Sequence, residues 1–314
     1  MTTTARPLLV AGDCNVDLVL RGDVVPRFGQ AEQLLDSGEL VVGGSASIAA
    51  NGLARLGVPT TLAARVGDDA FGRFMVDTLH AAGVRTGSVA VDADVPTGIS
   101  VILSAPSDRA ILTVPGTIPT LSADDVLAAL GDAAHVHVAS YFLQPRLAGE
   151  LPALFAELRS RGVSTSLDTN WDPAERWAGL TEVLPVVDYL LPNLEELRAI
   201  AAATGATAAR DESLARHLAA LGPRVVVKAG AAGGWSVARG DELVAAPGLS
   251  VDVVDTTGAG DSFDAGYLAA VAYGVDDERE RLRWATSAGS LSTRAAGGTA
   301  AQAVRAELGE RPPG

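Results

Sequence analysis

Short apolar runs rich in β-branched residues alternate with helical patterns along most of this 314-residue chain. Such alternation is typical of a mostly parallel sheet that helices cover on both faces. The runs predict buried strands at residues 8–11, 61–66, 135–139, 163–167, 189–191 and 225–228. The intervening patterns predict helices at residues 45–56, 70–82, 145–161, 194–203 and 212–221. The expected fold class is therefore α/β, with a mostly parallel central sheet.

Two stretches, residues 16–40 and 89–114, interrupt this alternation with short strands and few helical patterns. Within the second stretch, residues 97–103 and 110–114 flank a turn signal, Ala-Pro-Ser-Asp at 105–108. We predict that both stretches form a small antiparallel sheet inserted into the N-terminal half of a single domain, 1–314. Such a sheet could serve as a lid or as a dimer surface. The alternative is an antiparallel extension of the main sheet.

Charge and cysteine content narrow the class of protein. The formal net charge is -14, from 24 basic and 38 acidic residues, which argues against nucleic acid as a partner. The single cysteine, Cys14, excludes an intrachain disulfide. The chain has no apolar run of about 18 residues that could span a membrane, and the run at 8–11 is too short for a signal-peptide core. We therefore expect a cytoplasmic protein without a membrane partner.

Residues 255–263 read Asp-Thr-Thr-Gly-Ala-Gly-Asp-Ser-Phe, where an expected strand over 251–255 leads into a helix over about 258–273. A helix that begins with small residues leaves several N–H groups bare, and its dipole favours an anion such as phosphate. Asp261 follows at once, so we infer that it takes a proton from a group that attacks the anion. The alternative is a tightly packed helix start with Asp261 as a dipole partner. The expected anion donors are the N–H groups of Gly258, Ala259 and Gly260.

This motif resembles the C-terminal signature of the ribokinase-like carbohydrate kinases, the PfkB family. Further segments resemble motifs of that family in the same order; they are residues 43–47, 52–57, 65–72, 192–196 and 228–234. The resemblance runs from about residue 8 to residue 299. It implies a ribokinase-like three-layer α/β/α fold with a small antiparallel lid sheet. It also implies an ATP-dependent kinase that phosphorylates a hydroxymethyl group of a sugar or sugar-like molecule.

The resemblance further implies roles for individual residues, with ATP and Mg²⁺ as cofactors and K⁺ as a candidate. Asp261 would be the general base. Glu196 would serve the Mg²⁺ shell through water, and Asp255, beside the loop 294–299, would hold a monovalent cation. The nucleotide-binding residues would be Asn193, Lys228, Gly230, Gly233 and Thr257. Simpler interpretations remain open, namely a helix cap for the pair Asn193 and Glu196, a strand-end lysine for Lys228, and a hairpin turn for the glycines.

The acceptor would be recognised where the first strand ends and where the Gly-Gly turn begins. Carboxylates pair strongly with the hydroxyl groups of a diol. The candidates are Asp13, Asn15, Asp17, Gly43, Gly44 and Asn51. For Asp13, a turn that leaves the strand is an equal alternative. The chain departs from the family at Ile48, where an asparagine is usual, at Ser45, where ribokinases proper have lysine, and at 168–172, which lacks the usual arginine.

These departures leave the acceptor open. A nucleoside kinase on the same scaffold is the alternative, with Trp171 or Tyr141 stacking on a base or a sugar face. A non-catalytic sugar-binding relative is disfavoured because Asp261 is present. A dinucleotide-binding oxidoreductase is disfavoured because residues 11–15 lack the glycine pattern of that class. The lid strands also make a homodimer a reasonable expectation.

Overall fold

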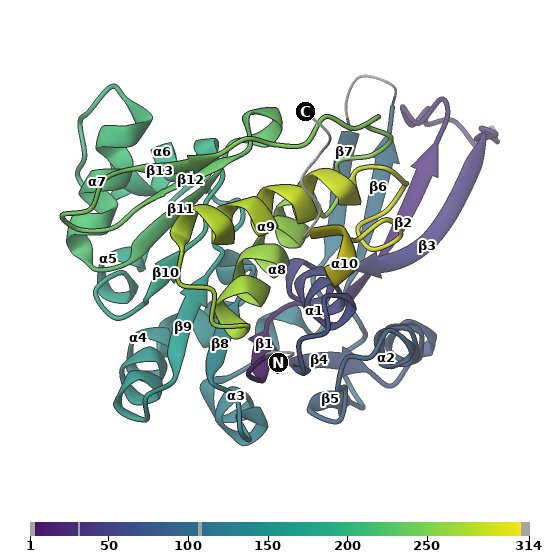
Figure 1. Cartoon of the computed structure of the whole chain (residues 1–314). Helices are drawn as coiled ribbons and strands as arrows, with labels where there is room; N and C mark the ends of the chain where they lie inside the picture. Colours follow the sequence, from purple (N-terminus) through teal and green to yellow (C-terminus); the bar gives the residue numbers. More distant parts are fainter. Residues whose placement is uncertain (1–3, 31, 106–108, 309–314) are drawn as a thin grey trace.

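The computed structural model describes residues 4–30, 32–105 and 109–308. Within these ranges the strands form a nine-stranded sheet and a separate four-stranded sheet (Figure 1). The order in the large sheet is β13-β12-β11-β10-β9-β8-β1-β4-β5. Its strands are β1 (Leu8–Ala11), β4 (Thr60–Gly67), β5 (Val89–Asp92), β8 (His135–Val138), β9 (Ser164–Leu167), β10 (Tyr189–Leu190), β11 (Arg224–Lys228), β12 (Gly234–Val237) and β13 (Val244–Ala246).

In the sheet order β11-β10-β9-β8-β1-β4-β5, each strand pairs in parallel with its neighbours. This confirms the mostly parallel central sheet expected from the sequence. Strand β1 lies between β4 and β8, with Leu8 opposite Thr60 on one side and His135 on the other. All of the sequence-predicted strands from 8–11 to 225–228 occur here, within one or two residues at their ends. The edge strands β12 and β13 pair antiparallel with their neighbours.

The lid is smaller than predicted. Strand β5, expected to be part of the lid stretch 89–114, instead pairs in parallel with β4 in the main sheet. A helix connects these two strands, and such a β–α–β unit returns its second strand beside the first. The lid has the order β3-β2-β6-β7. Its strands are β2 (Asn15–Arg21), β3 (Ser37–Gly43), β6 (Ile99–Ser104) and β7 (Arg109–Val114).

The lid is also not wholly antiparallel. Its outer pairs, β2 with β3 and β6 with β7, are antiparallel, whereas the central pair of β2 with β6 is parallel. The predicted turn between β6 and β7 includes residues 106–108, which lie outside the described residues. Figure 1 shows the lid strands standing at one edge of the main sheet. The alternative, an extension of the main sheet, is therefore wrong.

Helices cover both faces of the main sheet, and alternate residues of β1 contribute to the two resulting cores. Leu8 and Val10 belong to one core, and Leu9 and Ala11 belong to the other, as the two-residue period of a strand requires. The first core contains residues of α1 (Ser45–Arg55), α2 (Ala70–Ala81), α8 (Ala259–Ala272), α9 (Glu278–Ser292) and α10 (Arg305–Leu308). The second contains residues of α3 (Ala123–Ala129), α4 (Pro145–Ser160), α5 (Leu180–Val183), α6 (Leu194–Ala203) and α7 (Asp211–Leu221).

The strand predicted at 251–255 is absent, and these residues form an irregular segment before α8. The amides of Val254 and Asp255 both donate to the carbonyl of Thr293, just after α9 ends. The segment is therefore tied to a helix end and not to a neighbouring strand. Two of its apolar side chains, Val253 and Val254, are exposed, so their β-branched pattern reflects no buried strand.

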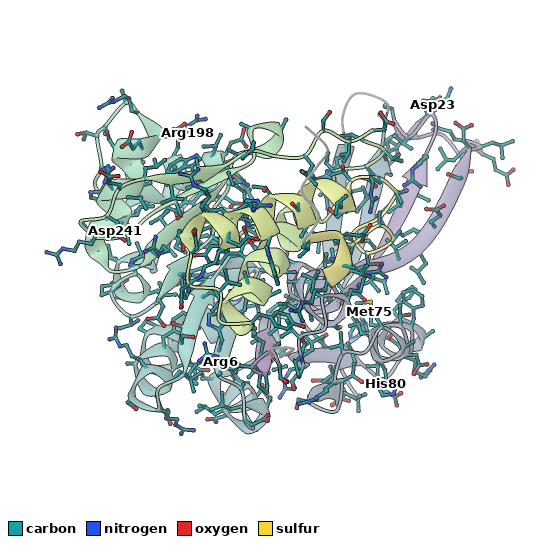
Figure 2. All side chains as sticks on the ribbon, in the orientation of Figure 1. Arg6, Asp23, Met75, His80, Arg198 and Asp241 are labelled. Atoms are coloured by element: carbon teal, nitrogen blue, oxygen red, sulfur yellow. The ribbon has the colours of Figure 1, made fainter. Side chains whose placement is uncertain are left out.

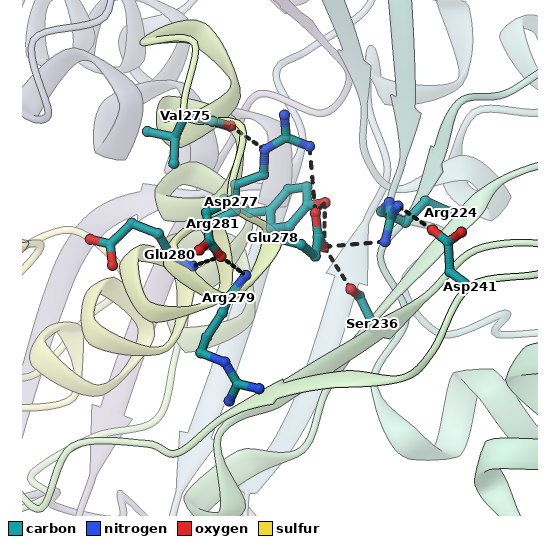
Figure 3. A network of polar contacts seen from close by, with 10 residues as sticks. Arg224, Ser236, Asp241, Val275, Asp277, Glu278, Arg279, Glu280 and Arg281 are labelled. Atoms are coloured by element: carbon teal, nitrogen blue, oxygen red, sulfur yellow. Dashed lines mark hydrogen bonds and ion pairs between the residues drawn. The ribbon is translucent and has the colours of Figure 1, made fainter.

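A polar network ties α8 and α9 to the far end of the main sheet (Figure 3). The carboxylate of Glu278, at the start of α9, accepts hydrogen bonds from Ser236 at 2.6 Å and from Tyr267 at 2.9 Å. Arg281 lies 3.4 Å from the same carboxylate. Because Ser236 is on β12 and Tyr267 is on α8, this network helps to fix α8 relative to the sheet.

Charged side chains such as Asp23, Arg198 and Asp241 lie at the periphery of the molecule, as Figure 2 shows. Met75, by contrast, is fully buried in the first core. Among the described residues, no helix is long and apolar enough to span a membrane.

Candidate active site

Helix α8 begins inside the motif at 255–263 without a capping side chain. Its N-cap residue, Gly258, has φ of 70°, in the left-handed region that glycine tolerates. A Cβ atom on Gly258 would also lie 2.7 Å from Cα of Gly298, so a larger residue would force this close contact apart. The amide of Ala259 donates to a carbonyl in the preceding turn at 3.2 Å. Gly258 and Gly260 are therefore the better anion donors of the predicted three.

Asp261 lies in the first turn of α8 and is 8% exposed. Burial, with the nearby Asp168 carboxylate as the second cause, raises the pKa of Asp261 to about 8, while Lys228 opposes the shift. The side chain of Ser45, at the start of α1, lies close enough to the carboxyl group to lower its pKa. A carboxylate with a pKa near the working pH is a better proton acceptor than an ordinary aspartate.

A cavity of about 560 Å³ lies against this helix start. Lys228 and two glycines of the β11–β12 hairpin, Gly230 and Gly233, line it together with Ala259 and Gly260. The predicted nucleotide loop and the predicted anion hole therefore share one cavity, at the C-terminal end of β11. Ligands of α/β sheets bind at such strand ends. The hairpin that was the simpler interpretation of these glycines is present as well.

Lys228 is engaged by two carboxylates that were not among the predicted site residues. Its Nζ lies 2.6 Å from Oδ2 of Asp168 and 3.1 Å from Oδ2 of Asp264. Burial alone would lower the pKa of Lys228, but the two carboxylates raise it above its ordinary value. Lys228 is therefore a buried, paired ammonium at the wall of the cavity, and not the solvent-reaching lysine of the simpler interpretation.

Asn193 and Glu196 form the helix cap that was the alternative to a metal-shell role. Oδ1 of Asn193 accepts the amides of Glu195 and Glu196 at 2.9 Å, and Oε2 of Glu196 accepts the amide of Asn193 at 2.8 Å. Burial raises the pKa of Glu196 to about 7, with Asp168 as the second cause. A buried carboxylate whose ionisation is disfavoured gains from a nearby cation, so the cap does not exclude a role toward Mg²⁺.

Asp255, the first residue of the motif, contacts the predicted loop wall at 294–299. Its carboxylate accepts the amide of Thr257 at 2.9 Å and the amide of Gly297 at 3.0 Å, which brings the two segments together as expected. A guanidinium nitrogen of Arg21, from lid strand β2, lies 3.8 Å away. Arg109, from lid strand β7, donates to the Thr257 hydroxyl at 2.8 Å. The lid therefore contacts the segment that leads into the predicted anion hole.

In the lid pair β2–β3, Gly43 lies opposite Asn15, and the Asp17 carboxylate packs over Gly43. A Cβ atom on Gly43 would lie 2.0 Å from Oδ1 of Asp17, so the carboxylate requires glycine at this position. Asn15 donates to Oδ1 of Asp17 at 3.1 Å. Burial raises the pKa of Asp17 to about 7, with the Asp13 charge as the second cause. Three of the predicted acceptor residues therefore lie together on the lid.

Asp13 caps helix α1 from outside the helix. The N-cap residue of α1, Gly44, has no side chain, and Asp13 accepts the amides of Ser45 at 3.1 Å and Ala46 at 2.9 Å. The Ser140 hydroxyl donates to the same carboxylate at 2.8 Å. Both oxygens of Asp13 already accept hydrogen bonds, so its first role is to hold the start of α1 beside the site.

Asn51 lies elsewhere than predicted. Its amide donates to Gln302 at 2.6 Å, in the packing of α1 against the C-terminal segment, about 9 Å along the helix from Ser45. Asn51 therefore does not lie with the other predicted acceptor residues. Ile48, where the chain departs from the family pattern, packs closely against Gly298. A Cβ atom on Gly298 would lie only 2.6 Å from the Ile48 side chain. It fills the space between α1 and the anion-hole loops with apolar atoms.

Sequence reasoning missed Asp168, Asp264, Ser140 and Asn170 as parts of this site. Asn170 accepts the amide of Ser140 at 2.8 Å and donates to the hydroxyl of Ser45 at 2.9 Å. Both Ser140 and Asn170 have positive φ, of 56° and 53°, which is uncommon for residues other than glycine. Their positions in the sequence could have pointed to three of these residues, because Ser140, Asp168 and Asn170 closely follow the C-terminal ends of predicted strands.

Comparison with known proteins agrees with the family resemblance of the motifs. A family model described as pfkB family carbohydrate kinase matches residues 6–304. The ribokinase of Bacillus subtilis (strain 168) is 30% identical over 97% of this chain and 99% of its own. An ATP-dependent ribose-1-phosphate kinase of Halopiger xanaduensis (strain DSM 18323 / JCM 14033 / SH-6) is 30% identical over 97% of this chain and 98% of its own.

A solved structure agrees as well. Arabidopsis thaliana ribokinase, complexed with ribose and ATP, has a TM-score of 0.83 and 26% sequence identity to this chain, covering 97% of each. The resemblance inferred from the motifs and the ribokinase-like fold are thereby confirmed. The chain belongs to the pfkB family of carbohydrate kinases, whose members are ATP-dependent sugar kinases.

Proposed function

We propose that this protein transfers the γ-phosphoryl group of ATP to a hydroxymethyl group of a neutral sugar or sugar-like molecule. Asp261 accepts the hydroxyl proton while the acceptor oxygen bonds to phosphorus and the bond from phosphorus to the ADP oxygen breaks. The observation that carries the proposal is the position of the buried Asp261, between a cavity lined by Gly260 and the start of α1 at Ser45. Positioning and charge stabilisation then supply most of the rate.

The acceptor end of the site favours an uncharged molecule. Asp17 and Asp13 are buried there, and each carboxylate disfavours a second negative charge nearby. We therefore place sugar phosphates, such as the acceptor that the Halopiger relative's name gives, second to neutral sugars.

A nucleoside acceptor is the second candidate, and Trp171 supports it. The Trp171 side chain is 46% exposed and contacts Trp177 edge to face, with ring centroids 5.1 Å apart. Its open face could stack on a base. Tyr141 is less suited to this role because it is 4% exposed and packs against Phe142.

Two cations fit the residues of the site. A Mg²⁺ ion would neutralise phosphate oxygens, and Glu196 would hold it through water, since Mg²⁺ keeps several of its waters. A monovalent cation such as K⁺ would take the Asp255 carboxylate and carbonyl groups of the loop 294–299, whose Gly297 amide already contacts Asp255. Its charge would add to that of the anion hole.

We also propose that the lid serves as the surface between two copies of this chain. Lid residues Leu40, Ile111, Leu112 and Val114 are large, apolar and exposed. Large apolar side chains that a sheet exposes to solvent are candidates for burial in a protein interface.

A screen for ADP release with ATP and Mg²⁺ is expected to show turnover with a neutral pentose or hexose. Keto-deoxy sugars, ribose-1-phosphate and nucleosides form the comparison arms. A true acceptor at about a hundredfold over its Kd would also stabilise the fold by roughly 2.7 kcal/mol in thermal unfolding. Turnover only with nucleosides would move the assignment to the second candidate, and turnover with none would contradict the proposal.

Asp17→Asn is expected to raise KM for the acceptor by about 10- to 100-fold, because a charge-assisted hydrogen bond to a sugar hydroxyl is lost. KM for ATP should stay within about threefold, since Asp17 lies on the lid and outside the nucleotide cavity. Steady-state kinetics with each substrate varied in turn measures both. Asp23→Asn is the control, because Asp23 is an exposed carboxylate of the same lid region. An unchanged acceptor KM in Asp17→Asn would remove Asp17 from the site.

A further inference from the structure

Asp168, Asp261 and Asp264 form a buried carboxylate cluster with Lys228 as its counter-ion. Oxygen atoms of the three acids lie within 4.8 Å of one another, and each side chain is buried. Lys228 bonds to Asp168 and Asp264 from the C-terminal end of β11. Three acids against one ammonium would leave a net charge of -2 beside a site that binds phosphate. Such a charge would oppose phosphate binding, so protonation of acids in the cluster would favour it.

Asp264 has the contacts of a neutral carboxyl group. It is 1% exposed, and its Oδ1 has no hydrogen-bond partner among the residues that the structure describes. A buried ionised oxygen without a donor is costly, whereas a neutral carboxyl oxygen costs much less. Asp264 also lies close enough to Asp168 to share a hydrogen bond with it. In agreement, burial raises the pKa of Asp264 well above its ordinary value, while Lys228 keeps the pKa of Asp168 low despite burial.

Lys228 is held directly behind the anion hole. A Cβ atom on Gly260 would lie 3.8 Å from Nζ of Lys228, which is ordinary van der Waals distance. The ammonium thus adds positive charge next to the Gly260 amide without leaving its two carboxylate partners. If either partner were lost, the long lysine side chain could rotate toward the cavity that it lines.

We propose that Asp264, in its neutral form, is a positioning residue that bridges Asp168 and Lys228 and keeps the ammonium behind the anion hole during phosphoryl transfer. The inference rests on the proposed kinase function for its kinetic readout, but its structural readout needs no substrate. Asp264 does not touch the reacting atoms in this role. It acts through Lys228, whose charge supports the developing charge on the transferred group.

The kinetic test compares Asp264→Asn with Asp264→Leu. Asn can still donate to Asp168 and accept from Lys228, so it should keep about a third or more of the parent kcat. Leu removes the bridge, and kcat should fall by about tenfold or more while KM for ATP changes less than about threefold. Equal losses in both variants, an unchanged kcat in Asp264→Leu, or a tenfold rise of the ATP KM with kcat kept would each overturn the proposal.

The structural test measures thermal unfolding of parent and Asp264→Asn without ligand. Because the folded-state pKa of Asp264 is raised, the parent takes up a proton on folding and loses stability as pH rises above about 4. Asn needs no proton, so the Tm advantage of Asp264→Asn should grow between about pH 4 and pH 8. The other charges facing Asp264 are Asp168, Lys228 and Asp261, which are unchanged in the variant.

A Tm of Asp264→Asn below that of the parent at pH 8 would overturn the proposal, because it would mean that an ionised Asp264 supports Lys228. Since this arm needs no acceptor, it separates a failure of the inference from a failure of the kinase assignment. Asp125→Asn is the matched control. Asp125 lies away from the site, and its carboxylate accepts a hydrogen bond of 3.0 Å from Arg65. Removing that carboxylate should leave kcat unchanged.

Discussion

Asp261→Asn is expected to lower kcat by about a thousandfold, within the range of a lost general base, while ATP binding is largely kept. The amide cannot accept the hydroxyl proton, yet it has nearly the same shape, so the cavity and the Gly258 and Gly260 amides stay in place. In the parent, kcat/KM for the acceptor should rise with pH toward about 8, because the base works only when ionised. The residual activity of the variant should lack that rise.

Steady-state kinetics over pH, with ATP binding measured separately by calorimetry, tests this expectation. Asp252→Asn is the control, because Asp252 is an exposed carboxylate on the segment that leads into the same motif. A parent-like kcat in Asp261→Asn would show that the proton goes elsewhere. Loss of ATP binding in the variant would instead mean that Asp261 shapes the nucleotide site.

Lys228→Met is expected to reduce the free energy of unfolding by about 3–5 kcal/mol near neutral pH, the usual cost of breaking a buried ion pair. The side chains of Asp168 and Asp264 are 2% and 1% exposed, so water cannot replace the ammonium. The pKa of Asp168 is held low although burial opposes this, so its ionised form contributes stability above its unfolded pKa of about 4. The deficit of Lys228→Met should therefore shrink in acid, where Asp168 can become neutral.

Urea unfolding at pH 7 and at pH 4 measures this loss. Lys228→Met combined with Asp168→Asn and Asp264→Asn should recover much of it, because no unpaired charge then remains. Arg198→Met is the control, since it breaks an exposed pair with Asp211 and should cost less than about 1 kcal/mol. A cost below 1 kcal/mol for Lys228→Met would mean that the buried pair contributes little.

Local patterns predicted the main elements well. The strand at 225–228 and the helix at 194–203 are continuous in sequence, so their apolar period and caps suffice to locate them. The sequence places strand β5 in the lid because residues 89–114 contain short strands and few helical patterns. Only its pairing with β4 through a helical crossover assigns it to the main sheet. The segment 251–255 has a β-branched composition but pairs with the end of α9, which no local pattern reports.

The candidate site also contains some residues that local sequence patterns locate and others that only the fold brings together. Gly258, Gly260 and Asp261 are adjacent in sequence, and the start of one helix brings them together. Asn51 was proposed from its spacing to the Gly-Gly turn, but its amide bonds to Gln302, 251 residues away. Ionisable groups buried together depend on such distant contacts, and their charge states depend on all members at once.

The sequence by itself determined the α/β architecture, the family and the position of Asp261 in the first turn of a helix, because each depends on residues near one another in the chain. Only the tertiary structure decided that Lys228 is paired with two buried carboxylates. Its partners, Asp168 and Asp264, stand 60 and 36 residues away and meet it only when β9, β11 and α8 pack together. Because these groups are buried, each charge needs a partner of opposite sign. The spacing of the residues in the sequence cannot reveal which groups become partners.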